Sequence, residues 1–451
     1  MQIWASQALT DTGWCENVAI SIDKGIITQI QANAPPVGYH AGIVLPAPAN
    51  LHSHAFQRAM AGLTETRGPN EHDSFWTWRQ LMYRFLDQLT PDDVESITAF
   101  AQMEMLEAGF ARVGEFHYLH HLPDGTAYSD SAEMAVRIVA AAATTGIGLT
   151  LLPVLYQQAN CTGAPLNAGQ RRFGCNIDEF SRLFDGCRAA VQHLPNSGIG
   201  TAPHSLRAVT PDGLAAAITL GGDNPIHMHL AEQQAECDEI LNAYGSRPGR
   251  WLFDNAAVGE NWTLIHCTQL DKYEIATMAK TSATIGLCPV TEASLGDGIF
   301  DIPTLLANDG GFGIGTDSNI RIALAEELRG LEYSQRLRDK RRIIVSGDSP
   351  SVGRTLFDNT CRGGAKALAH GAGILGVGSP ADILGLDETV ADLAMYKGDQ
   401  ILDSFVFCGN NNFVKNLWVG GSHIVQQGQH FAHDSITASY HNVMKRLILD
   451  L

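Results

Sequence analysis

Short apolar runs separated by longer amphipathic segments recur along the middle of the chain, between residues 43 and 319. Each run ends at or near a polar residue, and most are followed by a segment with helical periodicity. The eight runs are Ile43–His54, Ala111–His117, Ile147–Tyr156, Ile199–His204, Pro225–His229, Trp262–His266, Ala283–Cys288 and Gly311–Asp317. A strand followed by a helix, repeated eight times, predicts an α/β fold of the (β/α)₈ barrel type.

The intervening helices have recognisable ends. Thr90-Pro91-Asp92-Asp93 supplies an N-cap, a proline in the first turn and acidic residues near the positive end of a helix, and Gly109 ends the segment. Two further segments, Ala132–Ala143 and Asp178–Leu194, have the apolar periodicity of outer helices. These signals support the barrel.

The two flanks of the chain are patterned differently from the middle. Val18–Ile30, with Asp23-Lys24-Gly25 at its centre, alternates as a β-hairpin does, and three C-terminal runs share this character: Ala381–Asp387, Phe405–Cys408 and Val414–Gln427. We therefore expect both chain ends to form one small composite β-domain beside the barrel, with Asp434–Leu451 as a terminal helix. The expected division is residues 1–47 for the N-terminal part of this domain, 48–375 for the barrel, and 376–451 for the C-terminal part.

Composition excludes several classes of protein. The chain has 451 residues, 45% of them hydrophobic and 17% charged, which is typical of a soluble globular protein. Nine cysteines without a C-x-x-C pair indicate neither a disulfide framework nor a thiolate zinc site, and favour a cytoplasmic protein. No secretory signal or membrane span is evident. A net charge of −18 argues against nucleic acid as a partner.

The predicted strand ends carry a set of polar residues that suits a metal. His52 and His54 lie at i and i+2 on one strand face, so both imidazoles can reach one ion. Other strand ends supply His229 and Asp317, and working residues of such barrels lie at this end. Three imidazoles and a carboxylate suit Zn²⁺ or Fe²⁺ with a position left open for water. We predict that His52, His54, His229 and Asp317 hold one divalent metal ion, zinc being favoured.

These motifs carry a family resemblance. His52-Ser53-His54, His229-Leu230-Ala231-Glu232, His266 and Thr316-Asp317-Ser318 resemble the amidohydrolase superfamily, in its mononuclear metal-dependent deaminase branch. The segment Gly376–Ile383 is similar to that superfamily's return from the barrel to the β-domain. The resemblance covers nearly the whole chain and implies a hydrolase.

Longer stretches are more specific. The segments Asn50–Gly62, Ser74–Arg79 and Gly114–Tyr118 resemble the formimidoylglutamate deiminase family. This resemblance implies the conversion of N-formimidoyl-L-glutamate and water to N-formyl-L-glutamate and ammonia in histidine degradation. It also implies a homodimer, and a contact between Gln57 and the formimidoyl group.

Roles for the remaining polar residues follow from this chemistry. We expect His266 and Asp317 to accept a proton from the attacking water, and Glu232 to carry protons to the departing nitrogen. A small anionic substrate with two carboxylates needs cations and donors. Arg207, next to His204, is the first candidate because guanidinium binds carboxylate bidentately, and Tyr118 and Arg79 follow.

Three alternatives remain open. The same chemistry could act on N-formimidoyl-L-aspartate, or on an aminated nucleobase such as guanine or adenine. The arginines favour a carboxylate substrate, since a flat base would favour stacking aromatic rings. A non-catalytic scaffold of the same fold would predict degraded metal ligands, and none is missing from the sequence.

Overall fold

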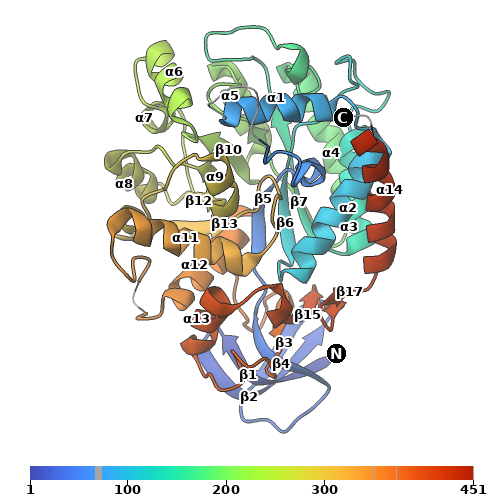
Figure 1. The fold of residues 1–451 in the computed structure, drawn as a ribbon, viewed down its shortest axis with the longest axis vertical. Helices are drawn as coiled ribbons and strands as arrows, with labels where there is room; N and C mark the ends of the chain where they lie inside the picture. The colour runs from blue at the N-terminus through green and yellow to red at the C-terminus, as the bar shows by residue number, and fades with distance from the viewer. Residues whose placement is uncertain (67–73, 348, 372, 450–451) are drawn as a thin grey trace.

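The barrel forms where the apolar runs predicted it. The structure is a computed structural model that describes residues 1–66, 74–347, 349–371 and 373–449 (Figure 1). Its barrel strands are β5 (Ala49–Ser53), β6 (Arg112–His117), β7 (Gly148–Leu155), β8 (Ser197–Ile199), β9 (Ala202–Pro203), β10 (Ile226–Leu230), β11 (Trp262–His266), β12 (Thr284–Leu287) and β13 (Gly311–Ile314). The fourth predicted strand, Ile199–His204, is divided between β8 and β9, both of which pair with β7.

Parallel ladders join β5 to β8 and β10 to β13, and isolated bridges close the ring. Thr201↔Ile226 and Ser205↔His229 connect the fourth strand position to β10, and Ser53↔Asp317 connects the first strand to the segment after the last. The first apolar run also divides: β4 (Tyr39–Pro46) leaves the barrel and β5 enters it, since the intervening Pro46-Ala47-Pro48 offers few backbone donors.

Helices surround the barrel and cross one end of it. The α-helices are α1 (Phe75–Leu86), α2 (Pro91–Glu107), α3 (Glu133–Thr145), α4 (Ile177–Val191), α5 (Pro211–Gly221), α6 (Gln234–Tyr244), α7 (Pro248–Asn255), α8 (Lys272–Lys280), α9 (Pro289–Leu295), α10 (Ile302–Leu306), α11 (Leu324–Asp339), α12 (Val352–Ala367), α13 (Asp399–Cys408) and α14 (His433–Leu449). Short 3₁₀ helices lie at η1 (Ala55–Met60), η2 (Ala168–Gln170) and η3 (Asn411–Phe413). Figure 1 shows α1 crossing the upper end of the barrel, opposite the end sheet.

Both chain ends contribute to one eight-stranded sheet, as expected. Its order is β17-β16-β15-β14-β4-β1-β2-β3. The strands are β1 (Gln2–Thr10), β2 (Gly13–Asp23), β3 (Ile26–Gln31), β4, β14 (Ile383–Leu386), β15 (Val414–Val419), β16 (Ser422–Gln426) and β17 (Gln429–His430). The composite sheet is therefore confirmed, whereas the boundaries near residues 48 and 375 stay predictions.

One predicted element is wrong. Phe405–Cys408 is the last turn of helix α13 and not a strand. The buried residues of α13 include Ile401, Leu402, Phe405 and Val406, which recur at helical spacing. A four-residue apolar run fits both a strand and a buried helix, and the residues before it decide between them.

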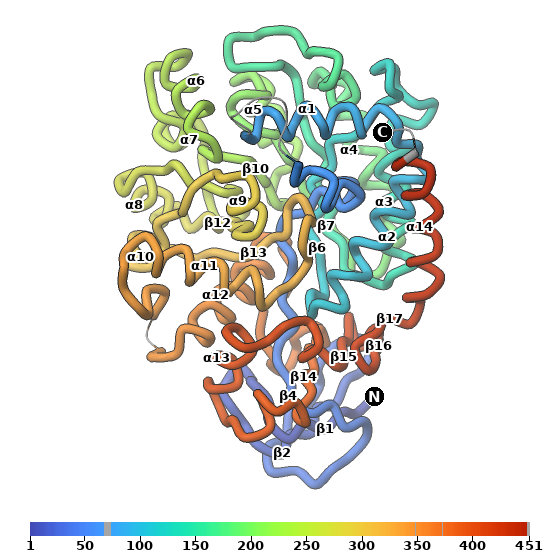
Figure 2. Tube along the Cα trace, viewed as in Figure 1, coloured from blue at the N-terminus to red at the C-terminus, as the bar shows by residue number. Residues whose placement is uncertain are grey.

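The terminal helix covers an outer face of the barrel. It spans His433–Leu449, and positions 450 and 451 of the predicted helix lie outside the described residues. Figure 2 shows α14 beside α2, and there Phe100 and Tyr440 stack with ring centroids 4.0 Å apart. Within the described part of the chain, no helix is both long and apolar enough to cross a bilayer.

Candidate metal centre and active site

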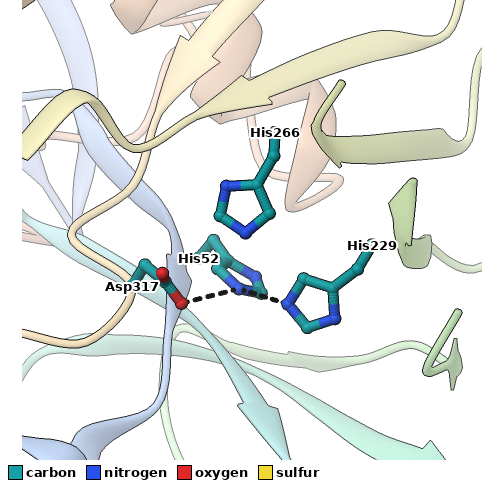
Figure 3. Close-up of side chains that lie close together, drawn as sticks. All are labelled: His52, His229, His266 and Asp317. Atoms are coloured by element: carbon teal, nitrogen blue, oxygen red, sulfur yellow. Dashed lines mark hydrogen bonds and ion pairs between the residues drawn. The ribbon is translucent and has the colours of Figure 1, made fainter. Parts of the chain in front are cut away.

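Four polar side chains converge above the barrel core. His52, His229, His266 and Asp317 are all buried, and one ligand atom from each lies within 4.8 Å of those of the others (Figure 3). His52 Nε2 lies 3.1 Å from His229 Nε2 and 3.3 Å from Asp317 Oδ1. The four residues come from β5, β10, β11 and the turn after β13. The barrel thus gathers residues that lie up to 265 positions apart.

His54 contacts the same carboxylate oxygen as His52. Its Nε2 lies 3.1 Å from Asp317 Oδ1, and its Nδ1 lies 2.9 Å from the Phe116 carbonyl oxygen. A carbonyl oxygen can only accept, so His54 donates through Nδ1 and a neutral ring keeps a lone pair on Nε2. That lone pair faces an anionic oxygen, an arrangement that a cation between the two would stabilise.

His229 is oriented in the same way. Its Nδ1 donates to the His204 carbonyl oxygen at 3.2 Å, which leaves the Nε2 lone pair facing His52 Nε2.

Burial lowers the pKa of His52 to about 3 and holds the pKa of His229 well below its usual range. Burial alone would raise the pKa of Asp317, but the interactions of its carboxylate with His52 and His54 outweigh burial and keep that pKa well below the ordinary value. Neutral imidazoles and an ionised carboxylate are the forms that bind a metal, so this donor set fits a divalent ion.

His266 lies at the edge of the cluster in a backbone conformation that aims its ring. Its φ is +67°, and the Cys267 N–H donates to the Ile265 carbonyl across it at 3.0 Å. This tight three-residue turn is uncommon and strained, and such outliers concentrate at functional sites. Nδ1 lies 3.3 Å from Glu292 Oε1, and Nε2 lies 4.0 Å from Glu232 Oε1. Burial lowers the pKa of His266, but the Glu232 charge and the Glu292 hydrogen bond raise it to about 10.

A cavity of about 550 Å³, its open mouth included, leads to this cluster. His52 is fully buried and does not line it. The other predicted site residues all do: His54, Gln57, Arg79, Tyr118, His204, Arg207, His229, Glu232, His266 and Asp317. Burial raises the pKa of Glu232 above its ordinary value, as expected for a carboxyl that exchanges protons near neutrality. The residues proposed for proton transfer and those proposed for substrate recognition therefore line one cavity.

Two arginines line the same cavity, Arg79 and Arg207. The Arg79 guanidinium lies 4.5 Å from the Trp76 ring centroid and that of Arg207 lies 6.0 Å from it. Arg207 Nη1 donates to Tyr156 Oη at 3.3 Å, whereas Arg79 Nε and Nη1 are buried without a hydrogen-bond partner among the described residues. A buried guanidinium without an acceptor is costly, so this pair is suited to an anionic ligand. Near the histidines, Gln57 Nε2 donates to Tyr118 Oη at 2.7 Å.

Some cavity residues were not found from the sequence. Helix α1 contributes Phe75, Trp78, Met82 and Tyr83, and other elements contribute Tyr156, Phe173 and Leu295. Tyr156 ends a predicted strand, and that position could have marked it. For the cavity residues Phe173 and Leu295, and for Glu292, which contacts His266, no local signal exists, because their places depend on how loops and short helices pack over the strands.

Comparison with known proteins agrees with this geometry. The model of the amidohydrolase family matches residues 43–424, so the chain belongs to the amidohydrolase family. Residues 1–38 match the N-terminal domain of formimidoylglutamate deiminase HutF.

Individual relatives extend over the whole chain. The chain is 45% identical to the formimidoylglutamate deiminase of Pseudomonas aeruginosa over 99% of both sequences. A crystal structure of an amidohydrolase from Brucella melitensis superposes with a TM-score of 0.95 at 45% identity, covering 99% of each chain. A zinc-bound adenosine deaminase from Xanthomonas campestris shares the fold alone, with a TM-score of 0.82 at 19% identity over 99% of this chain and 98% of that one.

Proposed function

We propose that this chain hydrolyses N-formimidoyl-L-glutamate to N-formyl-L-glutamate and ammonia, a step of histidine degradation. The observation that carries the proposal is Arg79, whose buried Nε and Nη1 have no hydrogen-bond partner among the described residues and which lines the same cavity as the histidine and aspartate cluster. Arg207, which lines the same cavity, gives it a second positive charge. The 45% identity to a formimidoylglutamate deiminase over nearly the full length of both chains supports the same substrate.

The metal would be held by His52, His54, His229 and Asp317, with His266 next to them, and we propose zinc because three nitrogens and one oxygen suit it. When bound there, such an ion would lower the pKa of water and make hydroxide available near neutrality.

The protein's own residues would move the protons. Glu232 and His266 face each other across 4.0 Å at the wall of the cavity, so either can reach a water held between the cluster and the substrate. A divalent ion bound beside His266 would disfavour its protonated form, so His266 and Asp317 would accept a proton and aim the water oxygen at the formimidoyl carbon. Glu232 would then deliver protons to the terminal nitrogen. As the bond between that nitrogen and the formimidoyl carbon breaks, the attacking oxygen gives up its second proton and becomes the formyl oxygen, so one water supplies both protons that the departing ammonia gains.

Substrate binding would use other side chains of the same cavity. Arg207 and Arg79 would bind the carboxylates, since each guanidinium presents paired N–H groups to two oxygens. Gln57, held by Tyr118, and His204 would contact the formimidoyl group and the nearer part of the substrate.

Ammonia release from N-formimidoyl-L-glutamate tests the proposal. The zinc-loaded protein should release ammonia rapidly and the metal-free protein should not. A folded, zinc-bound protein without activity on this substrate would overturn it, and N-formimidoyl-L-aspartate, guanine and adenine would then be assayed.

We also propose a cytoplasmic homodimer. All nine cysteines are free, which suits a reducing compartment. Light scattering in solution tests the dimer, and a monomeric mass would overturn it.

A further inference from the structure

The barrel closes between β5 and the segment after β13, and this seam carries three of the four proposed metal ligands. Among the described residues, one isolated bridge, Ser53↔Asp317, joins the two segments. The backbone N–H groups of Thr316 and Asp317 both donate to the His52 carbonyl, at 3.1 and 3.0 Å. His54 N–H donates to the Asp317 carbonyl at 2.9 Å. The backbones that carry His52, His54 and Asp317 are thus hydrogen-bonded to one another.

A set of buried polar side chains reinforces the seam. We call Asn50, Ser53, Thr316 and Asn319 the clasp. Asn50 Nδ2 donates to Thr316 Oγ1 at 2.6 Å, and Asn50 Oδ1 accepts from Thr316 N–H at 3.0 Å. The Thr316 hydroxyl donates to Asn319 Oδ1 at 2.5 Å, and Asn319 Nδ2 donates to Ser53 Oγ at 3.1 Å. The Asn50–Thr316 and Ser53–Asn319 hydrogen bonds cross the seam, and the Thr316–Asn319 hydrogen bond connects them.

The clasp also fixes the turn that presents Asp317. Asp317 and Asn319 have φ values of +47° and +55°, a region that costs free energy for most residues. Asn319 Nδ2 donates to the Asp317 carbonyl at 3.1 Å and so stabilises this turn from within. Gly315 precedes the turn, and a Cβ there would lie 2.8 Å from His52 Cβ, which shows how closely the two segments approach.

Closing the barrel does not by itself require buried polar side chains such as those of the clasp. Its four residues are at most 1% exposed, and none lines the active-site cavity. Buried polar groups cost free energy unless they are fully paired, whereas apolar side chains can close a barrel without that requirement. What the polar links add is direction, since hydrogen bonds fix the angles as well as the distance between segments.

We propose that the clasp is a positioning device that holds His52 and His54 at a set distance from Asp317 and thereby slows the release of a bound divalent metal. The inference rests on the metal site of the proposed function. Residues that orient metal ligands from outside typically change metal affinity by about 10- to 100-fold when replaced.

The test compares two identical substitutions. Thr316→Val removes a hydroxyl with two partners and keeps the side-chain shape. The control Thr263→Val, in β11, removes a hydroxyl that is equally buried but has no partner among the described residues. Each protein is loaded with zinc, desalted and mixed with an excess of a chromophoric chelator, and zinc release is followed well below the thermal midpoint. Release should be about 10- to 100-fold faster in Thr316→Val and unchanged in Thr263→Val.

The rate of global unfolding is measured in the same buffer. If Thr316→Val releases zinc at the wild-type rate, or only as fast as it unfolds, the clasp is a folding element and the proposal is overturned. Ser53→Ala, which removes one link, should accelerate release to a smaller extent and serves if Thr316→Val does not fold. Wild-type protein that retains no zinc would overturn both the metal site and the clasp. Wild-type protein that retains zinc without acting on formimidoylglutamate would overturn only the substrate, and zinc release would still test the clasp.

Discussion

Glu292 holds the ring of His266. Glu292 Oε1 lies 3.3 Å from His266 Nδ1 and also accepts the Cys288 N–H at 2.9 Å. The carboxylate is anchored at the start of α9, while the imidazole ends β11. The opposite nitrogen of the ring, Nε2, therefore points towards Glu232 and towards the other proposed metal-binding side chains.

We predict that Glu292→Gln lowers kcat by about 10- to 100-fold and leaves KM and zinc content near wild type. The amide still occupies the site but removes the charge that stabilises a protonated ring. Steady-state kinetics with metal analysis checks this, and Glu326→Gln, which changes a carboxyl paired with Arg321 outside the cavity, is the control. Unchanged kcat would mean that the orientation of His266 does not depend on Glu292.

Glu232→Gln should keep the metal and lose turnover. An amide cannot carry a proton, and general acid–base catalysis contributes about 10²- to 10⁴-fold to a rate. Zinc content and ammonia release are measured on the same sample. Activity at the wild-type level with zinc bound would remove Glu232 from the mechanism.

Arg207→Met should raise KM for N-formimidoyl-L-glutamate by roughly 10- to 100-fold, since a hydrogen bond to a charged group contributes about 1.5–3 kcal/mol. A formimidoyl amino acid without the side-chain carboxylate should be affected much less. Arg58→Met is the matched control, because Arg58 pairs with Glu104 outside the cavity. Equal effects on both substrates would place Arg207 away from the distal carboxylate.

Metal removal should abolish ammonia release and lower thermal stability. A ligand that binds the folded state at 1,000 times its Kd stabilises it by about 4 kcal/mol, and removing zinc forfeits that contribution. Dialysis against a chelator followed by zinc addition tests reversibility, with calorimetry in parallel. Full activity in a sample with no detectable metal would contradict the metal-dependent mechanism.

Stability should fall with pH below 6.5, in part through His117. Burial lowers the pKa of His117 from 6.5 to about 3. Between these values the unfolded chain binds a proton that the folded chain does not, so the free energy of unfolding falls as the pH falls. Measured from pH 7 to pH 4, the thermal midpoint of wild type should fall more steeply than that of His117→Phe. Parallel curves would show that His117 titrates alike in both states.

Much of the fold could be predicted from the sequence because the barrel strands and their helices carry local sequence signals. Thr90-Pro91-Asp92-Asp93 marked the start of α2, which begins at Pro91 with Thr90 as its N-cap. The prediction of a strand at Phe405–Cys408 is wrong because four apolar residues carry too little periodicity to distinguish a strand from the end of helix α13.

The sequence by itself determined which polar side chains stand at the strand ends, as candidates for metal binding, and the order in which the barrel collects them, since the carboxyl ends of parallel strands must meet at one rim. Tertiary structure alone decided which nitrogen of each ring faces the cluster, through carbonyl acceptors such as those of Phe116 and His204. It also decided that Glu292 orients His266 and that Trp76 lies beside both arginines. These contacts join segments far apart in the chain, and no local period or spacing records them, because they arise when separately formed elements pack together.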